Sequence, residues 1–305
     1  MRLLSLALST CILCFSSVSS AKVHVVTTST DLASLVSEIG QEHVSVKSIG
    51  KANQDIHYVQ ARPSFMVQLR RADLVVSVGL DLETAWLPLL LRGARNSTIL
   101  PGTTGYLELG DLIEPLAVPK TIDASQGHLH PRGNPHYWLD PLRIKSLLPF
   151  IEKRLSLLDP ANSAAYASNT KALTRALDTN LAKWDAQMAP YRGTRVISFH
   201  DTFQYFFNRY ELLNVDTLEP KPGVPPSPKH LSQVIVRARE SKTPVIFHEF
   251  YHDKRPSGLV ASRSGASLLI LPVSVNATAN TETYIQLIDT IVGQFTSTMA
   301  KRGTP

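Results

Sequence analysis

Three histidines lie within one short segment, Gly127–Pro141, which reads GHLHPRGNPHYWLDP. Near neutral pH, neutral imidazole is the commonest protein ligand for a transition metal, so His128, His130 and His136 could bind one. Pro135 fixes its own φ and pushes the residue before it towards extended geometry, which indicates that His136 is held in place. The alternative is a surface turn whose histidines have no common role, and this segment alone does not separate the two interpretations.

Two more histidines occupy positions suited to the same chemistry. His57 lies in a loop after a predicted strand, Val44–Ile49, and His200 ends another predicted strand, Arg195–Phe199. In open α/β sheets, ligands bind beyond the carboxyl ends of the strands. A lone histidine at a strand end is usually structural. One at the sheet edge of each half of the chain, together with His136, favours a metal site between the two halves.

A competing motif occurs later in the chain. Residues His248–His252 (HEFYH) match H-E-x-x-H, the signature of zinc peptidases. That chemistry needs a helix, so that both histidines face one metal ion while Glu249 activates a water molecule. The preceding residues Thr243–Phe247 instead have the pattern of a strand, and Pro256 limits any helix that follows. We expect a strand-end loop beside the cleft and no enzyme activity, and keep a zinc metallopeptidase as the alternative hypothesis.

The elements that must position these residues alternate between strand and helix patterns, which predicts βαβ units and parallel sheets. Asp73–Gly79 is almost entirely apolar, as expected for a strand covered on both faces. Near mid-chain, Ala161–Gln187 has helical spacing without glycine or proline and predicts a stiff connector. The predicted strands are Lys22–Thr28, Val44–Ile49, Asp73–Gly79 and Ser97–Leu100 in the first half, and Arg195–Phe199, Leu212–Leu218, Pro244–Phe247 and Ser267–Val273 in the second.

The expected fold is therefore α/β, with two Rossmann-like lobes whose parallel sheets are joined by one long rigid linker helix. The metal site is expected in the interlobe cleft. The domains that follow are an N-terminal lobe at 22–145, linker helices at 146–189 and a C-terminal lobe at 190–305. We find no close internal sequence repeat.

The first 21 residues have the features of a cleavable signal peptide. Arg2 is followed by an apolar run, Leu3–Phe15, which is too short to span a membrane. Ser19 and Ala21 are small residues at the spacing that signal peptidase prefers. We therefore expect export to the periplasm.

Both cysteines of the chain, Cys11 and Cys14, lie in this segment, so the mature protein can form no disulfide and can do no thiol chemistry. Either cysteine could instead carry a lipoprotein anchor, but the residues before them, Thr10 and Leu13, disfavour that alternative. The formal net charge is +6 and the basic residues are dispersed. The composition therefore gives no indication of nucleic-acid binding.

Four motifs in this chain, DIHYVQARPS, NPHYWLDP, SFHDTFQYFFNRY and PGVPPSPKHL, resemble those of the zinc/manganese solute-binding proteins of bacterial ABC transporters. The motifs follow the same order as in that family, and the resemblance covers essentially the whole mature chain. It implies two α/β lobes joined by one long rigid helix, with the metal between them. It also implies that His57, His136 and His200 are the first three metal ligands.

The chain departs from the family pattern in two places. The fourth ligand of the family is usually an aspartate shortly before the last helix, whereas this chain reads LPVSVNATAN and has Asn276 at or near that place. An amide oxygen is neutral and binds metal more weakly than a carboxylate, so the fourth ligand could be Asn276, water or another residue. The histidine-rich loop is also short, and its His128 and His130 either pass on metal or are merely exposed.

Three imidazole nitrogens without a certain carboxylate suit Zn²⁺, or copper by affinity, and disfavour Mn²⁺, which prefers oxygen ligands. We therefore expect Zn²⁺ as the transported ligand of a monomeric protein. Its partners are an ABC transporter membrane permease and, as an open alternative, a periplasmic metallochaperone that loads the site. A protein of similar fold that holds another ligand is the second alternative. Zinc affinity should fall as the pH drops through about 6.5, the unperturbed histidine pKa.

Overall fold

The computed structural model describes residues 21–119, 130–221 and 223–303. The predicted signal peptide lies almost entirely outside the described residues, as do Cys11, Cys14 and His128. Within the described part of the chain, no helix combines the length and the apolar character needed to cross a membrane.

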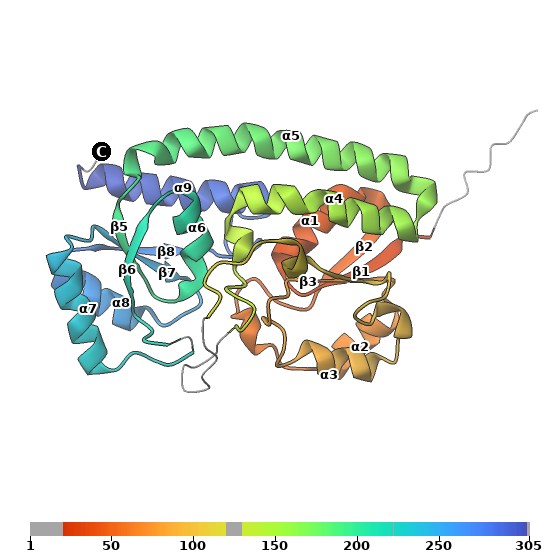
Figure 1. The fold of residues 1–305 in the computed structure, drawn as a ribbon, viewed down its shortest axis with the longest axis horizontal. Helices are drawn as coiled ribbons and strands as arrows, with labels where there is room; N and C mark the ends of the chain where they lie inside the picture. The colour runs from red at the N-terminus through yellow and green to blue at the C-terminus, as the bar shows by residue number, and fades with distance from the viewer. Residues whose placement is uncertain (1–20, 120–129, 222, 304–305) are drawn as a thin grey trace, which may run out of the picture.

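Two four-stranded parallel sheets form the framework, one in each half of the chain (Figure 1). The strand orders are β2-β1-β3-β4 and β6-β5-β7-β8, so the two halves share one topology although their sequences show no close repeat. The prediction of a two-lobed α/β fold is confirmed. The strands are β1 Val23–Thr27, β2 Val44–Ser48, β3 Leu74–Ser77, β4 Tyr106–Glu108, β5 Arg195–Ser198, β6 Leu213–Thr217, β7 Val245–Glu249 and β8 Ser267–Leu271.

Helices cover both faces of each sheet. In β3, every residue is buried, and successive side chains point to opposite faces: Val75 packs with α2 and α3, whereas Leu74 and Val76 face the central core. The second sheet has α7 and α8 on its outer face. The helices are α1 Thr30–Gly40, α2 Pro63–Arg70, α3 Leu87–Ala94, α4 Pro141–Leu158, α5 Ser163–Met188, α6 Gln204–Arg209, α7 Pro228–Glu240, α8 Lys254–Ser264 and α9 Tyr284–Lys301.

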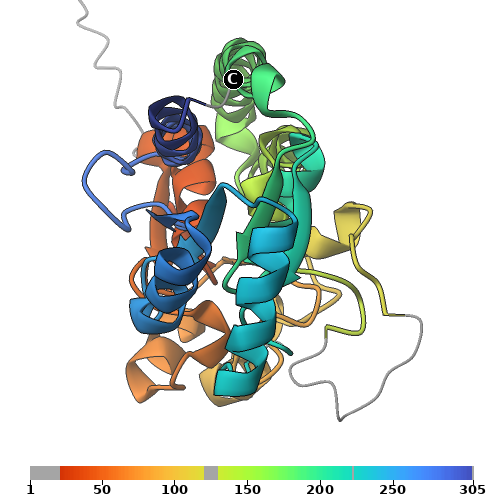
Figure 2. The same cartoon turned by 90° about the vertical axis from the view of Figure 1, so that its left-hand side faces the viewer.

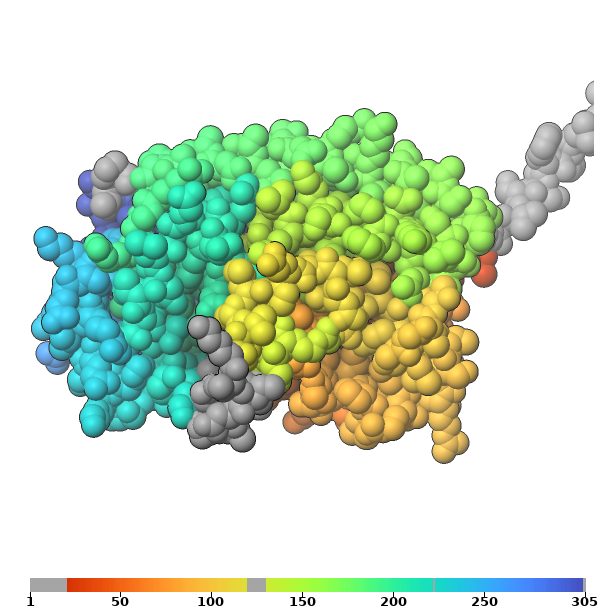
Figure 3. All heavy atoms as spheres, viewed as in Figure 1, coloured from red at the N-terminus to blue at the C-terminus, as the bar shows by residue number. Residues whose placement is uncertain are grey.

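Helix α5 connects the lobes, and α9 adds a second link. α5 buries one side chain at every third or fourth position from Tyr166 to Met188 and passes over both halves (Figures 1 and 3). α9 begins against the first lobe, where the Tyr284 backbone N–H donates to Ser34 Oγ at 3.2 Å, and it then packs against α5 and β8. Both helices lie at the same edge of the molecule (Figure 2). One continuous core runs through both lobes, so the connection is stiff.

Two predicted local features were wrong. Residues 97–100 do not form a strand, because Asn96 accepts a hydrogen bond from the Thr98 backbone N–H and starts a 3-10 turn, Ser97–Ile99; the fourth strand is β4. Pro256 does not prevent a helix, because it lies in the first turn of α8, where its missing N–H is not needed.

Candidate metal centre

Three histidines from distant parts of the chain meet where the two lobes face each other. His57, His136 and His200 each offer one ring nitrogen, and these atoms lie within 4.8 Å of one another. Their ring centroids are 5.2, 5.4 and 5.8 Å apart. His136 is 2% exposed and His200 is 9% exposed, so a metal held here would be largely removed from water. These are the three histidines that the sequence analysis predicted would converge.

His57 lies in a short 3-10 turn, Ile56–Tyr58, in the loop after β2. Asp55 Oδ1 accepts hydrogen bonds from both the His57 backbone N–H, at 2.9 Å, and His57 Nδ1, at 2.6 Å. Trp86 Nε1 donates to the Ile56 carbonyl at 3.0 Å and anchors the turn to the first lobe. The imidazole is therefore oriented by its own neighbour and by the core.

His136 has the same local arrangement. Asn134 Oδ1 accepts from the His136 backbone N–H at 2.8 Å and from His136 Nδ1 at 2.9 Å. The Asn134 side-chain Nδ2 donates to the Asp201 carbonyl at 2.8 Å, so it also ties this loop to the second lobe. Just after His136, Trp138 Nε1 donates to the Val273 carbonyl at 2.9 Å. His136 is thus held between the lobes and not on one of them.

His200 lies two residues after the end of β5, and its hydrogen-bond acceptor is distant in the sequence. Its Nδ1 lies 2.8 Å from Glu219 Oε2, and Glu219 follows β6, the neighbouring strand of the same sheet. The Glu219 backbone N–H donates to the Phe199 carbonyl at 2.9 Å, which continues the pairing of the two strands to this point. The carboxyl ends of β5 and β6 therefore bring His200 and Glu219 together.

In all three histidines, Nδ1 faces a side-chain oxygen. Such an oxygen accepts a hydrogen bond, so Nδ1 carries the proton and Nε2 is the nitrogen that can bind metal. Metal-binding histidines commonly have this second interaction, which fixes the tautomer and makes the ligand nitrogen more basic. The three rings are therefore oriented for coordination through Nε2, and the Nε2 atom of His57 faces another imidazole nitrogen, His130 Nε2, at 3.1 Å.

The pKa values of the three rings are not shifted alike. Burial lowers the pKa of His136 well below its ordinary value, so this ring is neutral and ready to bind metal. Burial also acts to lower the pKa of His200, but the hydrogen bond to Glu219 and the charges of neighbouring glutamates outweigh it and raise the pKa to about 9. His200 must therefore release a proton before it can coordinate at neutral pH.

A hollow of about 200 Å³ opens beside His57 and His200 and connects them to the surface. Its other lining residues are Asp55, Tyr58, Glu219, Gly223 and His252. Two of these lining residues, Asp55 and Glu219, are carboxylates, which attract cations.

The H-E-x-x-H motif differs in geometry from that of a zinc peptidase. His248 and Glu249 are the last two residues of β7, so the motif is not helical. His248 Nδ1 lies 2.9 Å from Ser257 Oγ, and His248 Nε2 lies 3.3 Å from the His252 carbonyl. In the described chain, these residues are not part of a cluster that could hold a metal. The motif therefore lacks the geometry that a zinc peptidase needs.

Asn276 is not brought to the histidines. It is exposed, has a φ of 65°, and its backbone N–H donates to the Thr281 carbonyl at 2.6 Å. It lines a separate hollow with Glu38 and Glu282. The turn is fixed here because the N–H of the preceding residue, Val275, is bonded to the buried Asp31 carboxylate at 2.9 Å. We therefore leave Asn276 out of the ligand set.

Asp55, Asn134 and Glu219 were missed in the sequence analysis. Asp55 and Asn134 each stand two residues before a histidine, and a short side chain at that spacing can bond both the backbone N–H and the ring. This Asx-x-His pattern was a usable signal. Glu219 is 19 residues from His200 and becomes its neighbour only through strand pairing, so no local signal existed.

Replacing Asn134 by alanine is expected to lower zinc affinity about tenfold, because His136 would lose the acceptor that orients it. Asn134→Asp keeps the acceptor for His136 but replaces the Nδ2 donor to the second lobe with a negatively charged oxygen, so its affinity should stay closer to that of the wild type. Competition against a chelator of known zinc affinity would measure both. Equal losses in the two variants would show that the interlobe bond, and not the orientation of His136, is what matters.

Taken together, the fold and the site define a metal-binding protein with two α/β lobes, of the solute-binding class that serves ABC transporters. Solved structures share this fold. One of them is described as "Crystal structure of ZnuA". Its chain matches this one with a TM-score of 0.77 and 23% identity, over 92% of this chain and 99% of that one. It also resembles the Cd-bound periplasmic metal binding protein from candidatus liberibacter asiaticus with a TM-score of 0.76 and 20% identity, over 91% and 100% of the two chains.

The chain belongs to the family described as zinc-uptake complex component A, periplasmic (ZnuA), which matches residues 25–298. Similar sequences include the manganese ABC transporter substrate-binding lipoprotein PsaA of Streptococcus pneumoniae, 26% identical over 81% of this chain and 78% of that protein. The iron-binding protein YfeA of Yersinia pestis is 27% identical over 89% and 84%. The chain is accordingly a metal-binding component of an ABC transporter.

Proposed function

We propose that this protein captures Zn²⁺ between its lobes with His57, His136 and His200 and delivers it to the membrane permease of an ABC transporter. The observation that carries this proposal is the convergence of three imidazoles, each with a ring nitrogen within 4.8 Å of the others. Their Nδ1 atoms are all engaged, so Nε2 is the nitrogen that each ring would give to a metal. The work is binding and release, with no chemical turnover.

The choice of zinc follows from the ligand atoms. Three nitrogens favour Zn²⁺ over Mn²⁺, which prefers carboxylate and carbonyl oxygens. The carboxylates nearby, Asp55 and Glu219, are engaged with the Nδ1 atoms of His57 and His200 and act on the metal through them. The description of the family supports zinc, whereas the named relatives bind manganese or iron, so the ion must be tested directly.

The cellular setting is part of the same proposal. A signal peptide at Met1–Ala21 would place the mature protein in the periplasm, as a monomer whose lobes span 22–145 and 190–305 with linker helices at 146–189. The permease is its membrane partner, and a periplasmic metallochaperone is a second partner that could load the open side of the site.

The test is a titration of metal-stripped mature protein with Zn²⁺ and, separately, with Mn²⁺. We expect one tight equivalent of zinc and a manganese affinity lower by on the order of 100-fold. The Glu249→Gln variant should still bind one equivalent of zinc tightly. Any protein-cleaving activity of the preparation should be the same as with the wild type. Manganese binding as tight as zinc binding would refute the choice of ion, and loss of a peptidase activity in Glu249→Gln would favour the enzyme alternative.

A further inference from the structure

A fourth imidazole, that of His130, lies at the edge of the cluster, beside His57 and His136. His130 Nε2 is 3.1 Å from His57 Nε2, and the two ring centroids are 5.1 Å apart. The ring of His130 is 6.5 Å from that of His136. Two nitrogens that bind one tetrahedral zinc ion are about 3.3 Å apart, because each Zn–N bond is roughly 2.0–2.1 Å. The hydrogen-bonded spacing of His57 and His130 is therefore also compatible with two ligands of one ion.

The three histidines of the proposed centre leave one tetrahedral position to be filled. Structural and tightly held zinc sites normally have four ligands, whereas an open fourth position is typical of catalytic zinc. Asn276 does not reach the centre, but His130 already lies at its edge. A nitrogen donor there would complete a site that excludes water and disfavours oxygen-seeking ions.

The chain just after His130 is built to hold a fixed position. The Gly133 backbone N–H donates to the His130 carbonyl at 2.9 Å and closes a turn. Gly133 has a φ of 106°, and a Cβ atom there would lie 2.7 Å from Pro115 Cβ and 2.9 Å from the Leu116 carbonyl oxygen. Only glycine fits this turn without displacing its neighbours.

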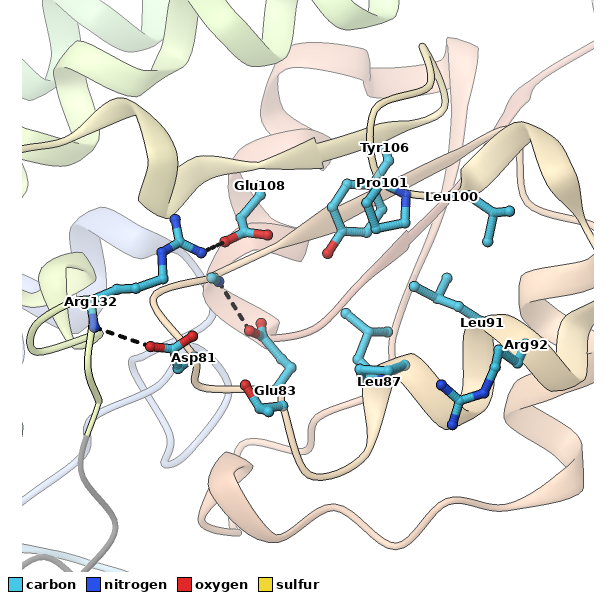
Figure 4. A pocket seen from close by; sticks show the side chains of 13 residues that line it. Asp81, Glu83, Leu87, Leu91, Arg92, Leu100, Pro101, Tyr106, Glu108 and Arg132 are labelled. Carbon is cyan, nitrogen blue, oxygen red and sulfur yellow. Dashed lines mark hydrogen bonds and ion pairs between the residues drawn. The ribbon is translucent and has the colours of Figure 1, made fainter. Parts of the chain in front are cut away.

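Arg132, inside the turn, is bound to three acidic residues of the first lobe. Figure 4 shows two of them, Asp81 and Glu108. Its backbone N–H donates to Asp81 Oδ2 at 3.1 Å, and its guanidinium pairs with Glu108, at 2.5 Å, and with Asp111. Asp81 follows β3, Glu108 ends β4 and Asp111 follows it. We call these four residues the Arg132 clamp. It fixes the turn, and with it His130, to the carboxyl end of the first sheet.

We propose that His130 is the fourth zinc ligand and that Arg132 is the positioning residue that keeps it at the site. This inference rests on the proposed zinc-binding function. Arg132 does not touch the metal; it acts through the turn that carries His130.

Whether zinc affinity rises or falls when Arg132 is replaced distinguishes a positioning role from a purely electrostatic effect of its charge. Arg132 is a cation near a cation site, so its charge alone disfavours metal binding, and removing that charge would tighten binding. If Arg132 acts as a clamp, its removal must instead weaken binding. Arg92 provides a matched control, because it is an exposed arginine that lines the same pocket as Arg132.

The experiment measures zinc affinity by chelator competition in the wild type, His130→Ala, Arg132→Met, the double variant and Arg92→Met. We expect His130→Ala to bind about 100-fold more weakly and Arg132→Met about tenfold more weakly. The double variant should match His130→Ala, because Arg132 has no effect without the ligand that it positions. Arg92→Met should bind as the wild type does. X-ray absorption should count four imidazoles on zinc in the wild type and three in His130→Ala.

Several results would overturn the inference. Wild-type affinity in His130→Ala, or three imidazoles in the wild type, would remove His130 from the ligand set. An additional tenfold loss from Arg132→Met in the His130→Ala background would show that Arg132 supports the fold and does not act through His130. Failure of the proposed function looks different, because the wild type itself would then bind no zinc tightly.

Discussion

Replacing His136 by alanine is expected to weaken zinc binding by about two to three orders of magnitude. Structural zinc sites have apparent binding free energies of roughly 10–16 kcal/mol, which four ligands share, so one ligand accounts for about 2.5–4 kcal/mol. His136 should reach this full value. Its ring is buried and neutral in the metal-free protein, so no proton has to leave before it binds.

The protein offers its own probe for this measurement. The ring of Trp138 lies 5.2 Å from that of His136, so intrinsic fluorescence should change when zinc binds, and chelator competition followed by this signal gives the affinity. His24→Ala is the matched control, because His24 is an exposed histidine at the start of β1 and far from the carboxyl ends of the strands. A zinc affinity in His136→Ala within a few-fold of that in His24→Ala would show that the centre lies elsewhere.

The loss in His136→Ala must be separated from damage to the fold. His136 precedes Trp138 and Leu139, which are buried in the core, so a large side-chain deletion could disturb the loop. Circular dichroism and the midpoint of denaturant unfolding of the metal-free variant should match those of the wild type. A large drop in unfolding free energy without zinc would mean that the variant reports on folding and not on coordination.

Local sequence patterns were sufficient for much of this molecule. The apolar run of β3, the uninterrupted helical spacing of α5 and the proline before His136 are properties of neighbouring residues, and each predicted its element or position well. The strand expected at residues 97–100 was wrong because β-branched composition cannot be distinguished from a capped turn without the contacts of Asn96. Helix α9 as a second interlobe link depends on the packing of Tyr284 near Ser34, 250 residues away.

The same distinction holds for the centre. His57 and His200 could be predicted because the carboxyl ends of parallel strands meet at one edge of a sheet, and His136 because Pro135 precedes it and its NPHYWLDP motif resembles that of the family. Two other contacts bring together residues that are distant in the sequence: Glu219 with His200, and Arg132 with Glu108. They form only in the folded chain, so no sequence spacing predicts them. The expectation for Asn276 came from its position before the last helix. In the structure Asn276 is exposed and lines a separate hollow, next to a backbone N–H, that of Val275, which is bonded to Asp31.

Zinc affinity is expected to fall about tenfold for each pH unit between 9 and 7, or about 100-fold in total, because one proton competes with the metal in this range. The group concerned is His200. Burial acts to lower its pKa, but the hydrogen bond to Glu219 and the charges of Glu249 and Glu219 raise it to about 9 in the metal-free protein. The competition therefore begins well above 6.5, the value that an unperturbed histidine would give.

The sign follows from the direction of the shift: below its raised pKa, His200 is protonated and Zn²⁺ must displace the proton from Nε2, so lower pH weakens binding. Chelator competition at pH 7, 8 and 9, corrected for protonation of the chelator, measures the slope. In Glu219→Gln the acceptor is neutral, so burial has more influence on the pKa of His200 and lowers it. The dependence of zinc affinity on pH between 7 and 9 should therefore become weaker. A wild-type affinity that does not change between pH 7 and 9 would contradict proton competition at His200. An unchanged slope in Glu219→Gln would assign the released proton to another group, and the Glu219–His200 pair would then serve to orient the ring without setting the pH at which the site fills.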